Sequence, residues 1–147
     1  MRLVSLFTAM MAVFGMSMAT INDTEAADLE NTIYLELKDG RVVIELLPEL
    51  APNHVKRIKE LSRAGFYDGI VFHRVIEGFM AQTGDPTGTG GGGSNKPDLK
   101  AEFSSERHLR GVVSMARSRN PNSANSQFFF VFDDASWLDN QYTVWGR

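Results

Sequence analysis

Two short runs of alternating residues flank an Asp-Gly pair, and this feature constrains the fold more than any other. Apolar residues stand at every second position, at Ile33, Leu35 and Leu37 and again at Val42, Ile44 and Leu46, with Asp39-Gly40 between the runs. Side chains that alternate along a strand point to opposite faces. An Asp-Gly pair favours a tight turn because both central residues of that turn need positive φ. The pattern therefore predicts an antiparallel hairpin.

The rest of the chain predicts one helix and several further strands. Val55, Ile58 and Leu61 recur at helical spacing among charged residues, and Gly65 follows as a typical helix end. We therefore expect a helix over Ala51–Ala64. Five more short apolar runs stand between turn-rich loops; they are Ile70–Val75, Phe79–Thr83, Gly111–Ala116, Phe128–Phe132 and Thr143–Arg147. Many short strands with one helix predict an antiparallel barrel or sandwich with a helical plug.

The start of the chain has the pattern of a secretory signal peptide. Arg2 precedes an apolar run that reaches Ala19, and Ser17 and Ala19 are the small residues that a cleavage site needs. The alternatives are an uncleaved membrane anchor, for which the run is short, and a wrongly assigned start codon. Residues 20–31 are polar and acidic, which predicts a flexible leader. We expect a signal peptide at 1–19, this leader, and one domain at 32–147.

Composition excludes several classes of function. The chain has no cysteine and three histidines, which removes thiolate nucleophiles, disulfides and thiolate metal sites. Its net charge of −3 argues against nucleic-acid binding, because a phosphate-binding surface is basic. The tract Gly84–Ser94 lacks the Lys-Ser/Thr pair of a nucleotide-binding loop, so it predicts a loop with positive φ at several positions. Asp133, Asp134 and Asp139 lack calcium-loop spacing, so no metal or cofactor is expected.

A histidine and an arginine stand side by side in the run FHRVIEGFMAQTGD. On a strand, His73 and Arg74 point to opposite faces. A lone strand histidine is more often a hydrogen-bonded structural residue than a general base. Arg74 has two interpretations: a surface ion pair with Glu77 or Asp85, or a charged donor in a site. Gln82 and several apolar residues follow the next turn, which places an arginine and an amide beside an apolar floor.

Four segments, taken in order, carry a family resemblance. They are FHRVIEGFMAQTGD, the GTGGGG loop, the S-M-A…NSQFFF segment and the W-L-D…Y-T-V-W-G segment. From about residue 32 to residue 147, the chain resembles the cyclophilin family of peptidyl-prolyl cis–trans isomerases. The resemblance implies a mostly β fold, an antiparallel barrel capped by an α-helix, with a proline-binding groove outside. The family continues past Arg147 with a helix and a closing strand, so the resemblance also implies a barrel that is incomplete at its C-terminal end.

The resemblance implies a role for each residue of the groove. It assigns catalysis to Arg74, whose guanidinium would donate a hydrogen bond to the prolyl nitrogen or the rotating carbonyl as the amide twists. Phe79, Met80, Phe129 and Leu138 would hold the proline ring. Gln82 and the backbone at Ala116-Arg117 would hold the flanking peptide. Trp137 matches the usual contact for a cyclosporin-like cyclic peptide, and Tyr142 stands on the pocket rim where many eukaryotic members have histidine.

The expected function follows from this resemblance. We expect an isomerase that accelerates X–Pro bond rotation in exported proteins, in the periplasm, because the signal-peptide pattern is similar to that of the bacterial periplasmic branch. The expected partners are proline-containing polypeptides and cyclosporin-like cyclic peptides, with no nucleic acid, no membrane after signal cleavage, and a monomeric state. Two alternatives stay open. One is a proline-peptide holdase without turnover, and the other is a fragment that aggregates through an unpaired strand at Thr143–Arg147.

Overall fold

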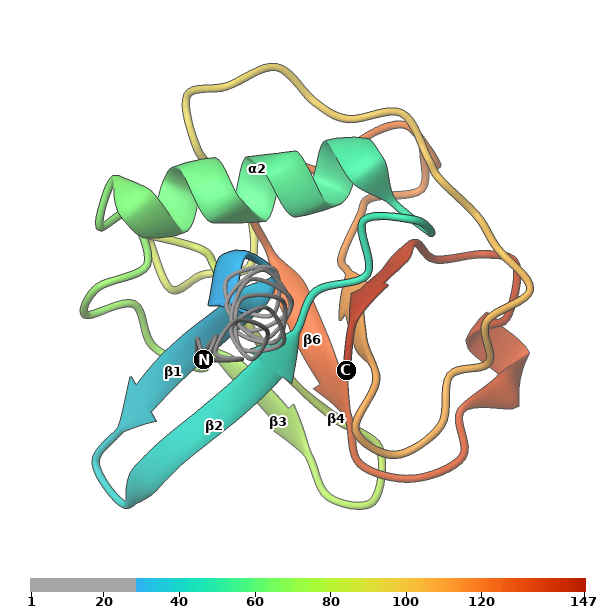
Figure 1. Ribbon diagram of the computed structural model, residues 1–147, viewed down its shortest axis with the longest axis horizontal. Helices are drawn as coiled ribbons and strands as arrows, with labels where there is room; N and C mark the ends of the chain where they lie inside the picture. Colours follow the sequence, from blue (N-terminus) through green and yellow to red (C-terminus); the bar gives the residue numbers. More distant parts are fainter. Residues whose placement is uncertain (1–28) are drawn as a thin grey trace, which may run out of the picture. The chain divides into compact units, whose positions relative to one another are not determined.

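The computed structural model describes residues 29–147, which form seven strands, one α-helix and one turn of 3₁₀ helix. The predicted signal peptide and most of the predicted leader lie outside the described residues. The elements are β1 (Thr32–Leu37), β2 (Gly40–Glu45), α2 (Pro52–Arg63), β3 (Arg74–Ile76), β4 (Met80–Thr83), β5 (Val113–Met115), β6 (Phe128–Val131), η1 (Ser136–Leu138) and β7 (Val144–Gly146) (Figure 1). Within this part of the chain, no helix combines the length and apolar character that a membrane crossing requires.

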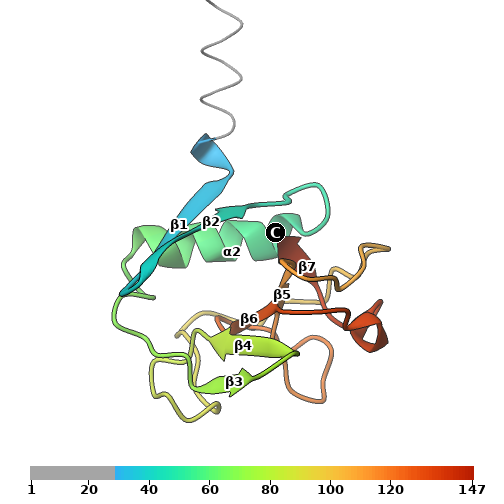
Figure 2. The same ribbon diagram turned by 90° about the horizontal axis from the view of Figure 1, so that it is seen from below.

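Every strand pair in the described residues is antiparallel. β1 pairs with β2 in an antiparallel hairpin, as the alternating runs predicted, and the other strands form a sheet in the order β3-β4-β6-β5-β7. The predicted turn is one residue off, because Leu37 lies opposite Gly40, so that Lys38 and Asp39 are the turn residues and of the predicted pair only Gly40 has positive φ. Backbone hydrogen bonds join the two sheets, because Glu45 N–H donates to Arg147 O at 2.8 Å and Leu47 N–H donates to Trp145 O at 2.9 Å. In Figure 2 the hairpin and α2 lie on one side of the domain and β3, β4 and β6 on the other. The mostly β antiparallel fold class with a single α-helix is confirmed.

The hydrogen-bonded strands form an open series rather than the closed ring of a barrel. Among the described residues, β1 pairs only with β2 and β3 pairs only with β4, so the series β1-β2-β7-β5-β6-β4-β3 has two free edges. A largely apolar groove of about 640 Å³ opens along the inner side of the strands, with Leu35 on β1, Val75 on β3 and Phe130 on β6 among its lining. The strand pairs of the described residues therefore do not close a ring. The run Thr143–Arg147, considered as an unpaired strand, contains β7, which pairs with β5.

Helix α2 packs its apolar stripe into the main core. Val55, Ile58 and Leu61 are buried, and the first two belong to the same cluster as Trp145 of β7. The helix start is held from a distant part of the chain, because the Glu102 carboxylate accepts the backbone N–H groups of Asn53 and His54, each at 3.1 Å. A carboxylate at this end of a helix satisfies free N–H groups and complements the helix dipole. The predicted helix is confirmed, one residue shorter at each end.

Two details of the fold differ from the sequence-based expectation. The strand predicted over Ile70–Val75 begins only at Arg74, and the carbonyl of Val71 accepts a hydrogen bond from the hydroxyl of Thr83 instead of a strand neighbour. The short helix η1 was not predicted, because one turn of helix is too short to produce a periodic pattern. Both details matter for the site, since Arg74 and Leu138 lie on these elements.

Candidate active site

Nine of the ten residues predicted for the groove line one pocket of about 170 Å³. These nine are Arg74, Phe79, Met80, Gln82, Ala116, Arg117, Phe129, Leu138 and Tyr142. The tenth, Trp137, is 59% exposed, and its ring packs against Phe79 with the two ring centroids 5.4 Å apart. The structure therefore brings together side chains that are spread over most of the domain.

Strand register explains why an arginine, an amide and an aromatic ring point to the same side. Arg74 of β3 lies opposite Gln82 of β4, and Gln82 lies opposite Phe129 of β6. Residues that are directly opposite in adjacent strands share a face of the sheet. Phe128 and Phe130 face the other way and pack with the main core. This alternation confirms that only the middle phenylalanine of the three reaches the pocket.

The apolar floor of the pocket rests on a second buried cluster. Met80 is 1% exposed and Phe129 is 5% exposed, and both pack with Leu138 of η1 in this cluster. The ring of Tyr142 meets Phe129 edge-on at 5.7 Å, and the Arg117 guanidinium lies 4.5 Å from the centroid of the Tyr142 ring. The pocket therefore has rigid apolar walls and a cationic rim, which suit a small aliphatic ring attached to a polar backbone.

A line of hydrogen bonds holds Arg74 in place. Its Nη1 donates to Gln82 Oε1 at 3.3 Å, and Gln82 Nε2 donates to Gln127 Oε1 at 2.8 Å. Gln127 Nε2 in turn donates to the carbonyls of Gly90 and Gly92. No ion pair joins Arg74 to Glu77 or Asp85 within the described residues, and Arg74 instead bonds to Gln82 and lines the pocket. The surface ion-pair interpretation of Arg74 is therefore wrong.

Gln127 is the main site residue that the sequence reasoning missed. It stands two residues before Phe129 in the segment NSQFFF, so a continued strand would place both side chains on one face. That spacing was the available signal. The spacing does not show the partners of this side chain. In the structure, Gln127 joins Gln82 to the glycine-rich loop.

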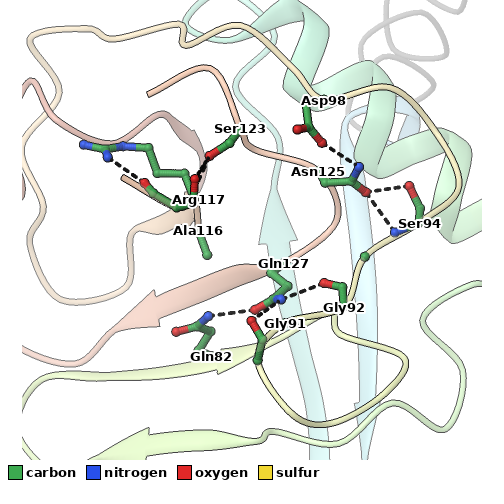
Figure 3. Close-up of a pocket in the computed structure, with 13 residues that line it drawn as sticks. Gln82, Gly91, Gly92, Ser94, Asp98, Ala116, Arg117, Ser123, Asn125 and Gln127 are labelled. Carbon is green, nitrogen blue, oxygen red and sulfur yellow. Dashed lines mark hydrogen bonds between the residues drawn. The ribbon is translucent and has the colours of Figure 1, made fainter. Parts of the chain in front are cut away.

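A second cavity, of about 390 Å³, adjoins the pocket and shares Gln82, Ala116 and Arg117 with it (Figure 3). Its wall is polar and comes from the glycine-rich loop and the segment before β6. Asn125 organises this wall, because its Oδ1 accepts hydrogen bonds from the Ser94 N–H at 2.8 Å and the Ser94 hydroxyl at 2.7 Å. The two cavities therefore adjoin each other at Gln82, Ala116 and Arg117.

The glycine-rich loop is folded around the carboxylate of Asp85, which is 1% exposed. This carboxylate accepts the backbone N–H groups of Thr87, Thr89, Gly90 and Gly92. Gly84, Gly88 and Gly90 have positive φ, which confirms the predicted loop conformation. The N–H groups that would face a phosphate in a nucleotide-binding loop face an internal carboxylate here. A phosphate cradle is therefore excluded on electrostatic grounds.

The remaining polar candidates, His73 and Asp139, lie in environments that indicate a structural role. Both ring nitrogens of His73 are buried and have no hydrogen-bond partner among the described residues, so the expectation of a hydrogen-bonded histidine is wrong. Asp139, considered above as a cation ligand, bonds to His108 instead. Over residues 29–147 no group of three or more His, Asp or Glu side chains is arranged to hold a metal ion.

Comparison with known proteins agrees with this geometry. The family model described as cyclophilin type peptidyl-prolyl cis-trans isomerase/CLD matches residues 32–147. The chain belongs to the cyclophilin family. It is 55% identical over 147 residues to a probable peptidyl-prolyl cis-trans isomerase of Brucella suis and 54% identical to that of Brucella abortus, and each match covers 92% of this chain and 75% of the relative. This cyclophilin is a peptidyl-prolyl cis–trans isomerase.

Solved cyclophilin structures share the fold. Cyclophilin AquaCyp293 from Hirschia baltica aligns with a TM-score of 0.72 and 33% identity, over 85% of this chain and 69% of that one. A Cryptosporidium parvum cyclophilin, crystallised in the presence of the dipeptide Ala-Pro, aligns with a TM-score of 0.75 and 33% identity, over 79% of this chain and 77% of that one. At this identity both fold and family are shared.

The carboxylate of Asp85 makes the stability of this cyclophilin sensitive to acid. Burial alone would raise the pKa of Asp85, but the hydrogen bonds from Thr87, Gly92 and Gly90 together hold it well below its usual range. A folded-state pKa below the unfolded value of about 3.9 gives stability that is present above pH 4 and is lost as pH falls further. We expect the Asp85→Asn variant to be less stable at pH 7 and to lose less stability than the parent between pH 4 and pH 2.

Urea unfolding at pH values from 7 to 2 measures this difference. Asp39→Asn is a matched control, because Asp39 is exposed in the hairpin turn and Asn and Asp are both common turn residues. Two parallel stability curves for the Asp85→Asn variant and the parent would show that the loop does not depend on this carboxylate.

Proposed function

We propose that Arg74 is the catalytic group of this cyclophilin and that the 170 Å³ pocket holds the prolyl ring of an extended polypeptide. The observation that supports this most strongly is the placement of one guanidinium beside an apolar floor, tethered by Gln82. The guanidinium presents a rigid planar fork of donors. Its tether uses one donor and leaves the others for a bound amide.

Rotation about an X–Pro bond needs electrostatic help rather than bond breaking. The barrier is roughly 18–20 kcal/mol because the amide loses resonance as it twists. In the twisted state the prolyl nitrogen has a free lone pair that can accept a hydrogen bond. A donor that reaches this nitrogen or the rotating carbonyl stabilises the twisted state more than either planar state, and so accelerates exchange. Phe129, Met80 and Leu138 hold the ring while the acyl half rotates.

The polar cavity beside the pocket suits the chain that flanks the proline. It opens directly from Gln82 and Arg117, which also line the prolyl pocket. Side-chain and backbone groups of Asn125, Ser94 and the glycine loop offer donors and acceptors to an extended peptide. This cyclophilin therefore acts on prolines in extended, solvent-accessible segments, which are the segments that unfolded chains expose.

The site of action is proposed to be the periplasm, with exported proteins as substrates. The signal-peptide pattern of residues 1–19 supports this, and cleavage after Ala19 leaves Thr20 as the first residue. The mass of the mature protein recovered from a periplasmic extract tests the assignment.

The protein is further proposed to be a monomer that binds a cyclosporin-like cyclic peptide at the rim of the prolyl pocket. The exposed Trp137, whose ring packs against Phe79 of this pocket, supports the binding of such a peptide.

Refolding of a protein limited by a slow X–Pro bond separates an isomerase from a holdase. Uncatalysed exchange takes tens to hundreds of seconds, so this phase is easily followed. We expect the full chain to accelerate the slow phase at about one molecule per hundred substrates, because an isomerase turns over. A holdase would need equal amounts and would slow refolding instead, which would overturn the catalytic proposal.

A further inference from the structure

A buried histidine links three elements directly beneath the pocket. The side chain of His108 is fully buried, with its Nδ1 3.0 Å from Asp139 Oδ1 and its Nε2 3.0 Å from Ser114 Oγ. The backbone N–H of His108 donates to the same Asp139 oxygen at 2.8 Å. The hydroxyl of Ser114 donates to the carbonyl of Thr143 at 2.9 Å. These bonds tie the segment before β5, strand β5 itself and the segment after η1 into one unit.

Each member of this unit contacts or adjoins a wall of the pocket. The imidazole of His108 stacks on Phe129, with centroids 6.4 Å apart and planes at 16°, and meets the Tyr142 ring edge-on at 6.5 Å. Ser114 lies opposite Phe129 in the pairing of β5 with β6. Asp139 follows Leu138 directly in the chain. None of the three members lines the pocket, so each acts on substrate only through a wall residue.

The short helix η1 needs such a tether. A single turn of 3₁₀ helix has few hydrogen bonds of its own, and here they include Leu138 N–H to the Ala135 carbonyl at 2.9 Å. The His108 backbone fastens both ends of this turn, since its carbonyl accepts the Ala135 N–H at 2.8 Å and its N–H bonds to Asp139. The bond from the backbone N–H of His108, followed by that from its ring, holds the pKa of Asp139 below its usual range. The tether is therefore charge-assisted at neutral pH.

The arrangement has the residue types of a hydrolytic triad but not its chemistry. Ser114 is fully buried, and its hydroxyl faces a backbone carbonyl, so no substrate atom can approach it. Hydrogen bonds inside a core fix geometry instead. We propose that Asp139, His108 and Ser114 form a positioning relay that fixes the Phe129 and Leu138 walls and thereby sets the affinity of the pocket for the prolyl ring. This inference rests on the proposed function of the pocket.

A second buried histidine of the same chain provides a matched control. His54 is also fully buried, and one Glu102 oxygen accepts both its backbone N–H at 3.1 Å and its Nδ1–H at 2.7 Å. This pair caps α2, and neither residue lines the pocket. Asp139→Asn and Glu102→Gln each weaken a contact in which one carboxylate oxygen bonds to both the backbone N–H and the Nδ1 of a buried histidine. Both variants should unfold at lower temperature than the parent.

The test compares substrate affinity and bound-state exchange rate in these two variants of the full chain. Exchange and titration NMR with an Ala-Pro peptide reports both quantities for the folded molecules. We expect Asp139→Asn to raise Kd about tenfold, the loss typical of one charge-assisted hydrogen bond. The exchange rate of the bound peptide should change less than twofold, because Arg74 is untouched. Glu102→Gln should leave both quantities unchanged, and the ring-proton shifts of Phe129 and Tyr142 should move only in Asp139→Asn.

An unchanged Kd in Asp139→Asn would overturn the relay, and so would an equal rise of Kd in both variants, since that would reflect general loosening. Ser114→Ala, which removes only the far end of the relay, is the milder second variant if Asp139→Asn does not fold. It should raise Kd about threefold, and an unchanged value would likewise overturn the relay. Failure of the proposed function would be seen separately, as absence of peptide exchange with the parent protein.

Discussion

Replacing Arg74 with alanine should lower kcat for X–Pro isomerisation by about 10²- to 10³-fold, the loss typical of one pre-organised electrostatic donor. The Kd of an Ala-Pro peptide should change by no more than about threefold, because the apolar walls that hold the ring remain. Such a split shows that the guanidinium contributes mainly in the twisted state. Exchange NMR on the same samples measures both quantities.

Two further arginine variants sharpen this result. Arg41→Ala removes an exposed guanidinium whose ion pair with Glu36 lies on the β1–β2 hairpin, and it should leave kcat and Kd unchanged. Arg74→Lys keeps the charge but loses the planar fork, so we expect a kcat between those of Arg74→Ala and the parent. Equal losses of binding and turnover in Arg74→Ala would contradict a specific catalytic role.

Replacing Gly84 with alanine should destabilise the domain by about 2–5 kcal/mol, from about 1–2 kcal/mol for positive φ and about 1–3 kcal/mol for steric overlap. Gly84 ends the turn from β4 into the glycine-rich loop at φ +88°. A Cβ there would overlap the backbone carbonyl of Ser126 and crowd the Cα of Gln127, and backbone atoms cannot move aside cheaply. The variant should also lose activity, because β4 carries Gln82 and the crowded segment leads into β6.

A variant at Gly111 separates the cost of positive φ from the cost of steric overlap. The φ of Gly111 is nearly the same as that of Gly84, at +93°, but an added Cβ there meets nothing within 4 Å. Gly111→Ala should therefore cost only about 1–2 kcal/mol, at about 4 °C in Tm for each kcal/mol in a domain of this size. Chemical denaturation of both variants gives the comparison. Equal losses would show that close packing against Ser126 contributes nothing.

The local sequence pattern was sufficient to predict the elements that depend on residues close together in the chain. The β1–β2 hairpin and helix α2 were predictable because alternation and helical spacing act within a few positions, although the turn of the hairpin lies at Lys38-Asp39 rather than at Asp39-Gly40. The single pocket-facing phenylalanine also followed from alternation along β6. The family motifs added the long-range information, since they placed Arg74 and Leu138 in one pocket although 63 residues separate them.

Contacts between segments that are distant in the chain could not be predicted from the sequence. Nothing near Glu102 indicates that its carboxylate caps a helix that begins some 50 residues earlier. Asp85 could be seen as a partner for Arg74, and only the folded loop shows its oxygens filled by backbone N–H groups. The link from Gln82 through Gln127 to the glycine loop depends on which strands pair. Side-chain alternation fixes faces, whereas strand partners are set by the whole fold.

Two-dimensional exchange NMR on a short Ala-Pro peptide, with the full chain added at catalytic amounts, tests the central claim most directly. The placement of Arg74 and Gln82 beside the apolar floor predicts strong cis–trans exchange cross-peaks, which Arg74→Ala should abolish. A well-dispersed protein spectrum without exchange cross-peaks would contradict the catalytic assignment and favour a proline-peptide holdase. A collapsed protein spectrum would contradict the fold itself and favour the aggregating fragment.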